Sequence, residues 1–568
     1  MAYDLKSIAA PRLSGRALQL FAAAMENAAS GPLLISKLYE DTGVNALRAA
    51  RVSESPSVAP SLPRMSAMQL AREKAVSVDE LWDIFEVAPE RRGFAFESAA
   101  DFVKAYLSGK ASPAHVAERV IEAIAHSNAG DRPLRAVIAS QAEDIRAQAA
   151  QSAERYLKKA PLGPLDGVPV AIKDELDLKG YATTGGTRFL AGKLGLAQAD
   201  STPVQRLRAA GAILIGKANM NEIGIDTSGF NAHFGVTRNP YGLDRLPGGS
   251  SSGSAAAVAA GLCPIAIGAD GGGSIRIPSA LCGVVGLKAT WSRVSEHGVL
   301  PLCFSVGHVG PIGATVRDAA LAYMVIAGPD AGDRNTLLQP LPHVDSLGNT
   351  DLSGVRIGVY DAWFEDSQAE VAKACREGIA LLVERGAKVV SVSLSDLNLC
   401  RVAHAVTILS EMATFARAYD DRHRKDYGLA VRVNLALARS FSGSDYVAAQ
   451  RIRTRLCHQL EELFEKVDVL ATPATAMTAP ALARDLLPLG ESNLNVTSAL
   501  MRFAFVGNLS GYPALSVPTG YDGAGLPVGL QLMAKPWEEG FLLQLGEVVE
   551  AGVLRKQPAR VVRFLGSL

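Results

Sequence analysis

Two serines of this chain lie in separate glycine-rich segments that could each form a reactive turn. Ser250 follows two glycines in the segment 248–250, and Ser274 follows three glycines in the segment 271–274, 24 residues further on. Glycine has no Cβ, so the main chain of such a turn can approach a reacting atom closely and point its N–H groups inward. The pattern therefore makes each serine a candidate nucleophile.

Other glycine-rich motifs explain these segments less well. The first cluster is not followed by the Gly-Lys-Ser/Thr of a phosphate-binding P-loop, and the second lacks the Gly-x-Gly-x-x-Gly spacing of a dinucleotide site. Neither Ser250 nor Ser274 is the central serine of a Gly-x-Ser-x-Gly elbow. The sequence thus disfavours a nucleotide site and an ordinary α/β-hydrolase.

A serine hydroxyl reacts only when a neighbouring base takes its proton. The histidines that follow Ser274 at the shortest distance in the sequence, His297 and His308, lie in loop-like segments without an evident partner acid. This disfavours a histidine-based triad.

Lys173 is the better candidate for the base, because it ends the apolar run 168–173. Burial disfavours the ammonium form and can make a lysine basic enough to act at neutral pH. Along a strand, Asp174 would point to the opposite side, whereas Glu175 would share the side of Lys173 and favour its charged form. The alternative is a solvated surface lysine, and the two serine turns favour the base.

Three segments together resemble the amidase signature enzymes: 170–174 around Lys173, 247–261 around Ser250, and 268–278 around Ser274. In that family the base is a lysine, a bridging serine follows a Gly-Ser cis peptide, and the acyl-accepting serine lies in the second turn. The resemblance implies that Lys173 is the base, Ser250 the bridge and Ser274 the nucleophile.

The resemblance also implies two-step acyl transfer, in which Lys173 withdraws the Ser250 proton while Ser250 takes that of Ser274. We expect the oxyanion to be held by backbone N–H groups, namely those of Gly271, Gly272, Gly273 and Ser274. Three further residues are expected to support the relay or brace the second turn, with ordinary loop capping as the alternative: Ser251, Asp270 and Arg276. Arg276 could also tune Lys173 through its charge.

Within the family, the chain is most similar to the plant-type fatty acid amide hydrolases, in segments that include 441–450, 472–480, 500–503, 525–531 and, more weakly, 10–47. Ala289 and Ser252 depart from the residues most common in the family. The plant-type branch also has serine at the position of Ser252. This likeness implies an amide substrate with a long acyl chain, such as an N-acylethanolamine, and a homodimer.

Other functions stay open. A broad-specificity amidase for short aliphatic or aryl amides would lack a long apolar acyl pocket. An amidotransferase-type subunit that supplies ammonia to a partner fits the long N-terminal extension poorly. A catalytically inactive scaffold is difficult to reconcile with an intact Lys173, Ser250 and Ser274.

Composition agrees with a large enzyme. The 568 residues include 57 basic and 57 acidic ones, without the dense basic run of a nucleic-acid binder. The six cysteines form no Cys-x-x-Cys pair, which disfavours structural zinc or an iron–sulfur cluster. We expect no metal and no cofactor. Asp4 and Lys6 interrupt any secretory signal, and the apolar stretch 255–269 is too short to span a bilayer. These features predict a cytoplasmic protein, and a lipid substrate would suit peripheral contact with a membrane.

The expected fold is α/β, with a large mixed, twisted sheet covered by helices on both faces. Strands at 212–215, 355–360 and 387–392 alternate with helices that begin at Thr202 and cover 371–382. Residues 1–93 form an N-terminal helical extension with a Ser/Pro-rich linker, and 94–568 form the catalytic domain. The extension either shapes the substrate entrance or packs against the core or a second subunit.

Overall fold

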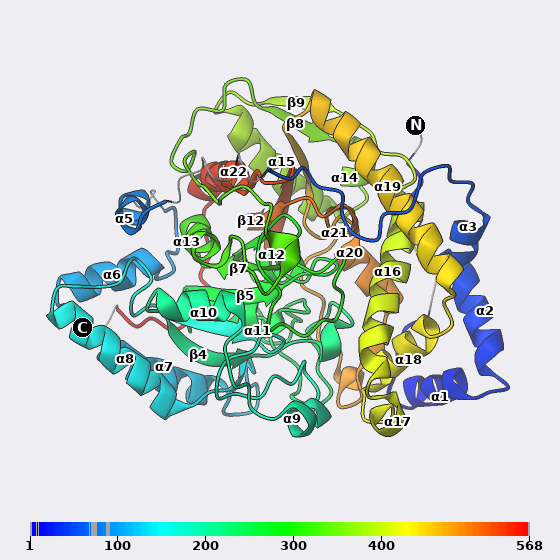
Figure 1. The fold of residues 1–568 in the computed structure, drawn as a ribbon, viewed down its shortest axis with the longest axis horizontal. Helices are drawn as coiled ribbons and strands as arrows, with labels where there is room; N and C mark the ends of the chain where they lie inside the picture. Colours follow the sequence, from blue (N-terminus) through cyan, green and yellow to red (C-terminus); the bar gives the residue numbers. More distant parts are fainter. Residues whose placement is uncertain are drawn as a thin grey trace.

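A mixed, 11-stranded sheet lies at the centre of the computed structural model, which describes residues 3–6, 8, 11–66, 69, 76–86 and 91–565 (Figure 1). In spatial order its strands are β2 (Val137–Ala139), β4 (Ile213–Ala218), β3 (Pro169–Lys173), β5 (Ile265–Ala269), β7 (Val309–Gly313), β6 (Val285–Lys288), β12 (Ala514–Tyr521), β13 (Pro527–Ala534), β10 (Val469–Pro473), β8 (Arg356–Val359) and β9 (Lys388–Ser391). Parallel pairs are β3 with β4 and β5, and β8 with β9 and β10; the other neighbours are antiparallel.

The helices of the first half of the chain are α1 (Gly15–Glu26), α2 (Gly31–Thr42), α3 (Val44–Ala49), α5 (Val78–Glu86), α6 (Ala99–Leu107), α7 (Pro113–Ser127), α8 (Ala142–Leu157), α9 (Phe189–Leu194), α10 (Thr202–Ala209), α11 (Ser252–Ala259) and α12 (Arg276–Leu281). Those of the second half are α13 (Val316–Ile326), α14 (Asp361–Phe364), α15 (Ala369–Val383), α16 (Leu397–Arg417), α17 (Asp420–His423), α18 (Leu429–Ala438), α19 (Gly443–Lys466), α20 (Leu494–Met501), α21 (Phe505–Ser510) and α22 (Glu539–Gly552). A separate two-residue ladder joins β1 (Leu13–Ser14) to β11 (Glu491–Ser492).

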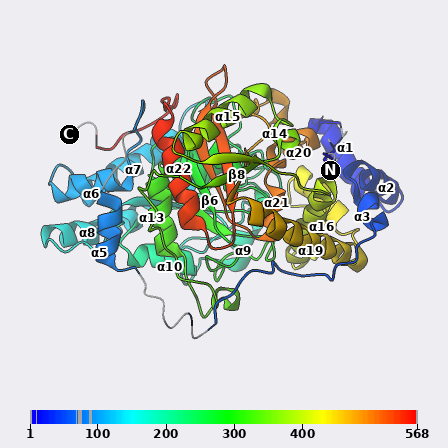
Figure 2. The same cartoon turned by 90° about the horizontal axis from the view of Figure 1, so that it is seen from above.

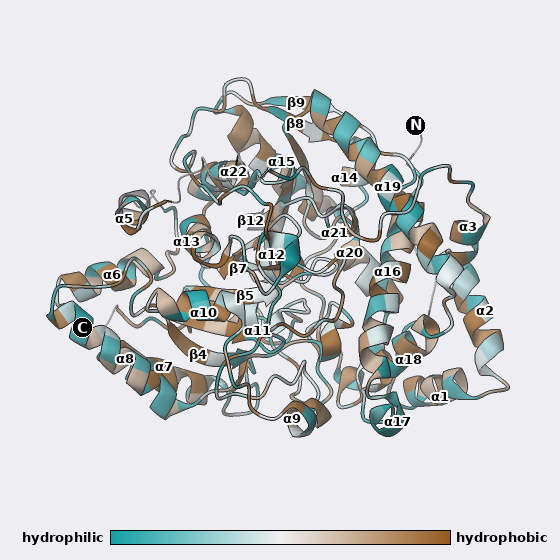
Figure 3. Cartoon of the chain, in the orientation of Figure 1, coloured by the Kyte–Doolittle hydropathy of each residue, from teal (hydrophilic) through white to brown (hydrophobic). Residues whose placement is uncertain are grey.

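Helices cover both faces of the sheet, as expected from the sequence. At β12, Leu515 contacts Gly546 of α22, whereas Ser516 points to the opposite side, where Gly529 meets Ala280 of α12. Successive side chains of a strand alternate between faces, so α22 and α12 lie on opposite sides. In Figure 3 the strands are mostly hydrophobic, while the outer helices alternate between hydrophobic and hydrophilic faces.

The strands and helices expected from periodicity are confirmed with small shifts at their ends. Helix α10 begins at Thr202, and α15 buries Val371, Cys375, Ile379 and Leu382 on one side. The strand expected at 387–392 is β9, an edge strand whose residues are largely exposed.

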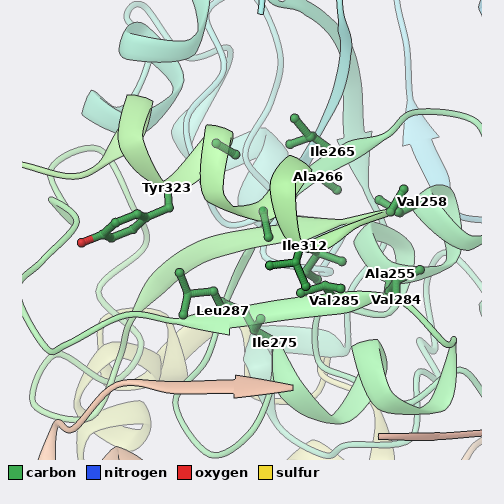
Figure 4. Packing of buried hydrophobic residues seen from close by; sticks show 14 of the residues in the cluster. Ala255, Val258, Ile265, Ala266, Ile275, Val284, Val285, Leu287, Ile312 and Tyr323 are labelled. Carbon is green, nitrogen blue, oxygen red and sulfur yellow. The ribbon is translucent and has the colours of Figure 1, made fainter. Parts of the chain in front are cut away.

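Helix α11 is buried on every side because it consists of small residues, Ser-Gly-Ser-Ala-Ala-Ala-Val-Ala. A Cβ at Gly253 would lie 2.2 Å from the carbonyl oxygen of Ala136, so only glycine allows this approach. Ala255 and Val258 of α11 belong to the same buried cluster as Ile265 and Ala266 of β5 (Figure 4). This packing holds the first serine turn against the central strands.

The N-terminal helices pack on α16, α18 and α19, at the opposite end of the molecule from α6, α7 and α8 (Figures 1 and 2). Arg48 pairs with Asp445 of α19 at 2.8 Å, and Glu26 pairs with Arg432 of α18 at 2.5 Å. These ion pairs attach α1 and α3 to helices that come more than 380 residues later in the chain.

Two further findings bear on the expectations from composition. Among the described residues, no helix is both long enough and apolar enough to cross a membrane. The six cysteines are free thiols, and five of them are buried.

Candidate active site

Lys173 occupies the carboxyl end of β3 and is 1 % exposed. Its Nζ donates hydrogen bonds to Ser250 Oγ at 2.9 Å and to the carbonyl oxygen of Ala269 at 3.0 Å. Glu175 Oε2 lies 3.3 Å from the same Nζ, whereas Asp174 points away and contacts Lys217 at 3.5 Å. The alternation expected along this strand is thus confirmed, and the lysine is not a surface charge.

Ser250 follows a cis peptide bond from Gly249, the feature that the family resemblance implied. A Cβ on Gly249 would lie 2.0 Å from Asn221 Oδ1, so the turn requires glycine at this position. The carbonyl oxygen of Ser250 accepts the N–H of Asn221 at 3.2 Å. These contacts fix the turn that carries the hydroxyl to Lys173.

Ser274 lies in the turn between β5 and α12, on the wall of a cavity that Lys173 and Ser250 also line. Within the described part of the chain, its Oγ has no hydrogen-bond partner, so the hydroxyl is available to a ligand. Ser251 joins the two serine turns: its N–H donates to the carbonyl oxygen of Ser274 at 3.1 Å, and its Oγ donates to that of Ala269 at 3.2 Å.

Asp270 braces the second turn from within. Its carboxylate accepts the N–H groups of Gly273 at 2.6 Å and Ile275 at 3.1 Å, and Arg276 Nε at 3.0 Å. Burial alone would raise the pKa of Asp270, but the Arg276 guanidinium outweighs it and holds this pKa well below its usual range. The carboxylate therefore stays charged and keeps the turn in place.

Arg276 is directed toward β13 and α21. Its Nη1 donates to Gln531 Oε1 at 2.7 Å, and its Nη2 donates to Asn508 Oδ1 at 2.5 Å. With its hydrogen bond to Asp270, these contacts hold Arg276 against the second turn. Asn508 and Gln531 were not singled out as site residues; Gln531 lies in one of the segments that carry the family resemblance.

Three backbone N–H groups of the second turn remain available. The N–H of Gly273 is taken by Asp270, while those of Gly271, Gly272 and Ser274 donate to no acceptor in the described part of the chain. These three are the candidates for an oxyanion hole.

His404 of α16 orients this turn and was missed in the sequence, where it lies 130 residues away from Ser274. Its Nε2 is 2.7 Å from the carbonyl oxygen of Gly271. Burial lowers the pKa of His404 to about 4, so the ring is neutral and Nε2–H is the donor. Because a trans peptide is planar, fixing this carbonyl directs the N–H of Gly272 to the opposite side.

The histidines considered as alternative bases do not bond to either serine. His308 lines the catalytic cavity, but its Nδ1 lies 2.8 Å from the carbonyl oxygen of Val306. Burial lowers the pKa of His308 well below its ordinary value. His297 is exposed. The geometry therefore favours the lysine.

Two cavities meet at Ser274. The smaller, of about 30 Å³, has a mixed lining: polar residues that include Lys173, Glu175, Ser250 and Glu296, and apolar ones that include Leu300 and Leu302. The larger, of about 220 Å³, is mostly apolar and runs between α16 and the N-terminal segment. Its N-terminal wall consists of Leu5, Ile8, Phe21, Leu38 and Val44, and its α16 wall includes Val402, Ile408 and Met412. Among the described residues, no cluster of His, Cys, Asp or Glu could hold a metal ion.

Comparison with known proteins decides the family. Residues 118–543 match the amidase family. The chain belongs to this family. The amidase is 39 % identical to a fatty acid amide hydrolase of Oryza sativa subsp. indica, over 98 % of this chain and 95 % of the relative. It is 38 % identical to a glutamyl-tRNA(Gln) amidotransferase subunit of Symbiobacterium thermophilum, over 79 % of this chain and 95 % of the relative.

Comparison with solved structures supports the same family. The peptide amidase of Stenotrophomonas maltophilia superposes with a TM-score of 0.71 and 30 % identity, over 82 % of this chain and 98 % of that one. The amidase is therefore an amide-hydrolysing enzyme with the amidase signature fold.

Proposed function

We propose that this amidase hydrolyses fatty acid amides through an acyl-enzyme on Ser274. The observation that carries the substrate class is the apolar cavity of about 220 Å³ that begins at Ser274. A long, apolar acyl pocket is what separates a lipid amidase from one for short amides. The plant relatives, which share nearly the full length of the chain, are named fatty acid amide hydrolases, and this supports the proposal.

In the acylation step, Lys173 Nζ takes the proton of Ser250 Oγ, and Ser250 takes that of Ser274. The freed Ser274 Oγ attacks the amide carbonyl carbon, and the free N–H groups of Gly271, Gly272 and Ser274 are the donors available to the oxyanion. The 2.9 Å contact between Lys173 and Ser250 supports the first transfer.

Collapse of the tetrahedral intermediate breaks the C–N bond, and the leaving amine takes its proton from Ser250, which regains one from Lys173. The acyl group then forms an ester with Ser274. Water attacks this ester through the same relay. This releases the carboxylic acid and restores the Ser274 hydroxyl.

The decisive experiment measures kcat/KM for ethanolamides with acyl chains from two carbons to about eighteen, with Ser274→Ala as the blank. Burial of each methylene contributes up to roughly 0.8 kcal/mol to transition-state binding, so kcat/KM should rise with chain length. A flat or falling series with Ser274-dependent cleavage would instead identify an amidase for short amides. Glutamine hydrolysis that appears only with a partner protein would identify an amidotransferase-type subunit.

We also propose the division of the chain into an extension, 1–93, and a catalytic domain, 94–568. Residues 1, 2, 7, 9, 10, 67, 68, 70–75 and 87–90 of the extension lie outside the described part. A cytoplasmic homodimer and peripheral membrane contact are part of the same proposal. Leu20 of α1 and Leu33 of α2 are 72 % and 75 % exposed, which gives the extension an apolar surface for such contacts. The molar mass from light scattering tests the dimer. It should be that of a dimer for the wild type and that of a monomer for Leu20→Glu/Leu33→Glu.

A further inference from the structure

The smaller cavity is the place for the leaving amine, if the proposed function holds. An acyl chain in the large apolar cavity puts the scissile carbonyl at Ser274, so the group beyond the C–N bond must point elsewhere. The small cavity is lined by Ser274 and by Ser250, the residue that returns a proton to the departing nitrogen. Acyl and amine moieties would thus bind on the two sides of Ser274.

Glu296 is the carboxyl group of this cavity whose side chain has no partner in the described part of the chain. Its backbone N–H donates to Asp333 at 3.1 Å, but among the described residues its side chain forms no hydrogen bond or ion pair. The neighbouring carboxylates are occupied: Glu175 pairs with Lys173, and Glu411 accepts hydrogen bonds from Ser305 and Tyr446.

The surroundings of Glu296 favour a neutral polar group. Burial, followed by the charges of Asp333, Glu175 and Glu411, raises the pKa of Glu296 to about 8. Near neutral pH its carboxyl can therefore both donate and accept a hydrogen bond. A ligand carboxylate placed here would meet several acidic groups at once, and like charges in an enclosed site repel strongly.

The size of the cavity adds a second restriction. Its volume is about 30 Å³. A site for one water molecule needs roughly 10–15 Å³ on the same scale, so the cavity has room for only a few water-sized groups. It therefore suits an amine with only a few non-hydrogen atoms.

We propose that Glu296 is the specificity-determining residue of a leaving-amine subsite, which accepts small amines that carry a hydroxyl group and rejects amines that carry a carboxylate. The Glu296 carboxyl hydrogen-bonds to the hydroxyl, while the charges of Asp333, Glu175 and Glu411 around it oppose the negative charge of an amino-acid leaving group.

The test compares three amides with the same long acyl chain: the ethanolamide, the propylamide, in which CH₃ replaces OH, and the N-acylglycine. The wild-type Glu296 carboxyl becomes charged as the pH rises through about 8, so kcat/KM for the N-acylglycine relative to the ethanolamide should fall roughly tenfold from pH 7 to pH 9 in the wild type. Glu296→Gln keeps a hydrogen-bonding group that cannot ionise, so the same ratio should stay level over this pH range. The ethanolamide to propylamide ratio should stay unchanged.

Glu296→Leu removes the hydrogen bond as well, and should lower the ethanolamide to propylamide ratio roughly tenfold. Glu384→Gln, a change of an exposed carboxyl after α15, is the matched control and should leave both ratios at the wild-type values. Hydrolysis of a p-nitrophenyl ester, whose leaving group needs no proton, verifies that each variant is folded and forms its acyl-enzyme.

The subsite would be overturned, with the fatty amidase intact, if Glu296→Leu kept the wild-type ethanolamide to propylamide ratio and Glu296→Gln kept the wild-type pH dependence of the N-acylglycine to ethanolamide ratio. A wild-type enzyme that cleaves the ester but none of the three amides would overturn the proposed function and the subsite with it.

Discussion

The two serine turns and the wall of the apolar cavity are built in different ways. The turns come from segments that are close in sequence, and they are held by main-chain contacts and by the Asp270–Arg276 pair. The cavity wall joins α16 to helices α1 and α2 from the start of the chain. Chemistry is therefore encoded locally, whereas substrate selection depends on side chains brought together by the fold.

The largest effect should come from the nucleophile. Ser274→Ala should lower kcat for every amide by about 10⁵-fold or more, because no other group can form the acyl-enzyme. The Tm of thermal unfolding should be unchanged, since Ser274 Oγ makes no hydrogen bond among the described residues. A fully active variant would refute the assignment.

Lys173→Ala should reduce amide hydrolysis by roughly 10²- to 10⁴-fold, the usual contribution of a general base. The residual rate should rise with pH, because hydroxide can replace the missing base. Rate measurements from pH 6 to 10 on a matched amide and ester check this. The rate of ester hydrolysis should fall less than the rate of amide hydrolysis, since the leaving group of the ester needs no proton. Equal losses would argue against proton delivery by the relay.

His404→Phe should lower kcat for short and long amides alike, by about tenfold or more, because the Gly271 carbonyl loses its donor and the oxyanion N–H groups shift. His458→Phe, at an exposed position of α19, serves as the control. An effect confined to long chains would place His404 with the cavity wall rather than with the turn.

A change in the cavity wall should separate binding from chemistry. Leu38→Trp should fill part of the cavity and lower kcat/KM for long acyl chains about tenfold, while two- to six-carbon amides keep their rates. Leu33→Trp, on the same helix but exposed, is the control. Equal losses at every chain length would remove α2 from the acyl site.

The smallest effect concerns stability. The pKa of Glu296 is raised to about 8 in the folded chain, and an unfolded glutamate has a pKa of about 4.3. The folded state thus binds the proton more tightly, so the contribution of Glu296 to stability is complete below about pH 4.3 and is lost as the pH rises through about 8. The Tm of Glu296→Gln relative to wild type should therefore increase from pH 5 to pH 8. A Tm difference between Glu296→Gln and wild type that does not change with pH would contradict the raised pKa of Glu296.

The sequence predicted the turns better than it predicted their surroundings. Glycine clusters and a lysine at a strand end are local patterns, and strand alternation correctly placed Glu175 beside Lys173. His404, Asn508 and the wall residue Leu38 carry no such pattern, because their roles depend on long-range packing. Glu296 likewise lies in an unremarkable loop segment and gains its significance only from facing the cavity.

The parallel pairing of β3 with β5 has a consequence for how the enzyme fails on heating. Ile172 pairs with Ile267, so Lys173 and the Ala269 carbonyl that it contacts emerge at the same end of neighbouring strands. Interstrand spacing thus sets the geometry of the proton relay, and turnover should persist until the central sheet itself melts. Selectivity for chain length depends instead on helices docked at the periphery, and it should decline at a lower temperature than catalysis.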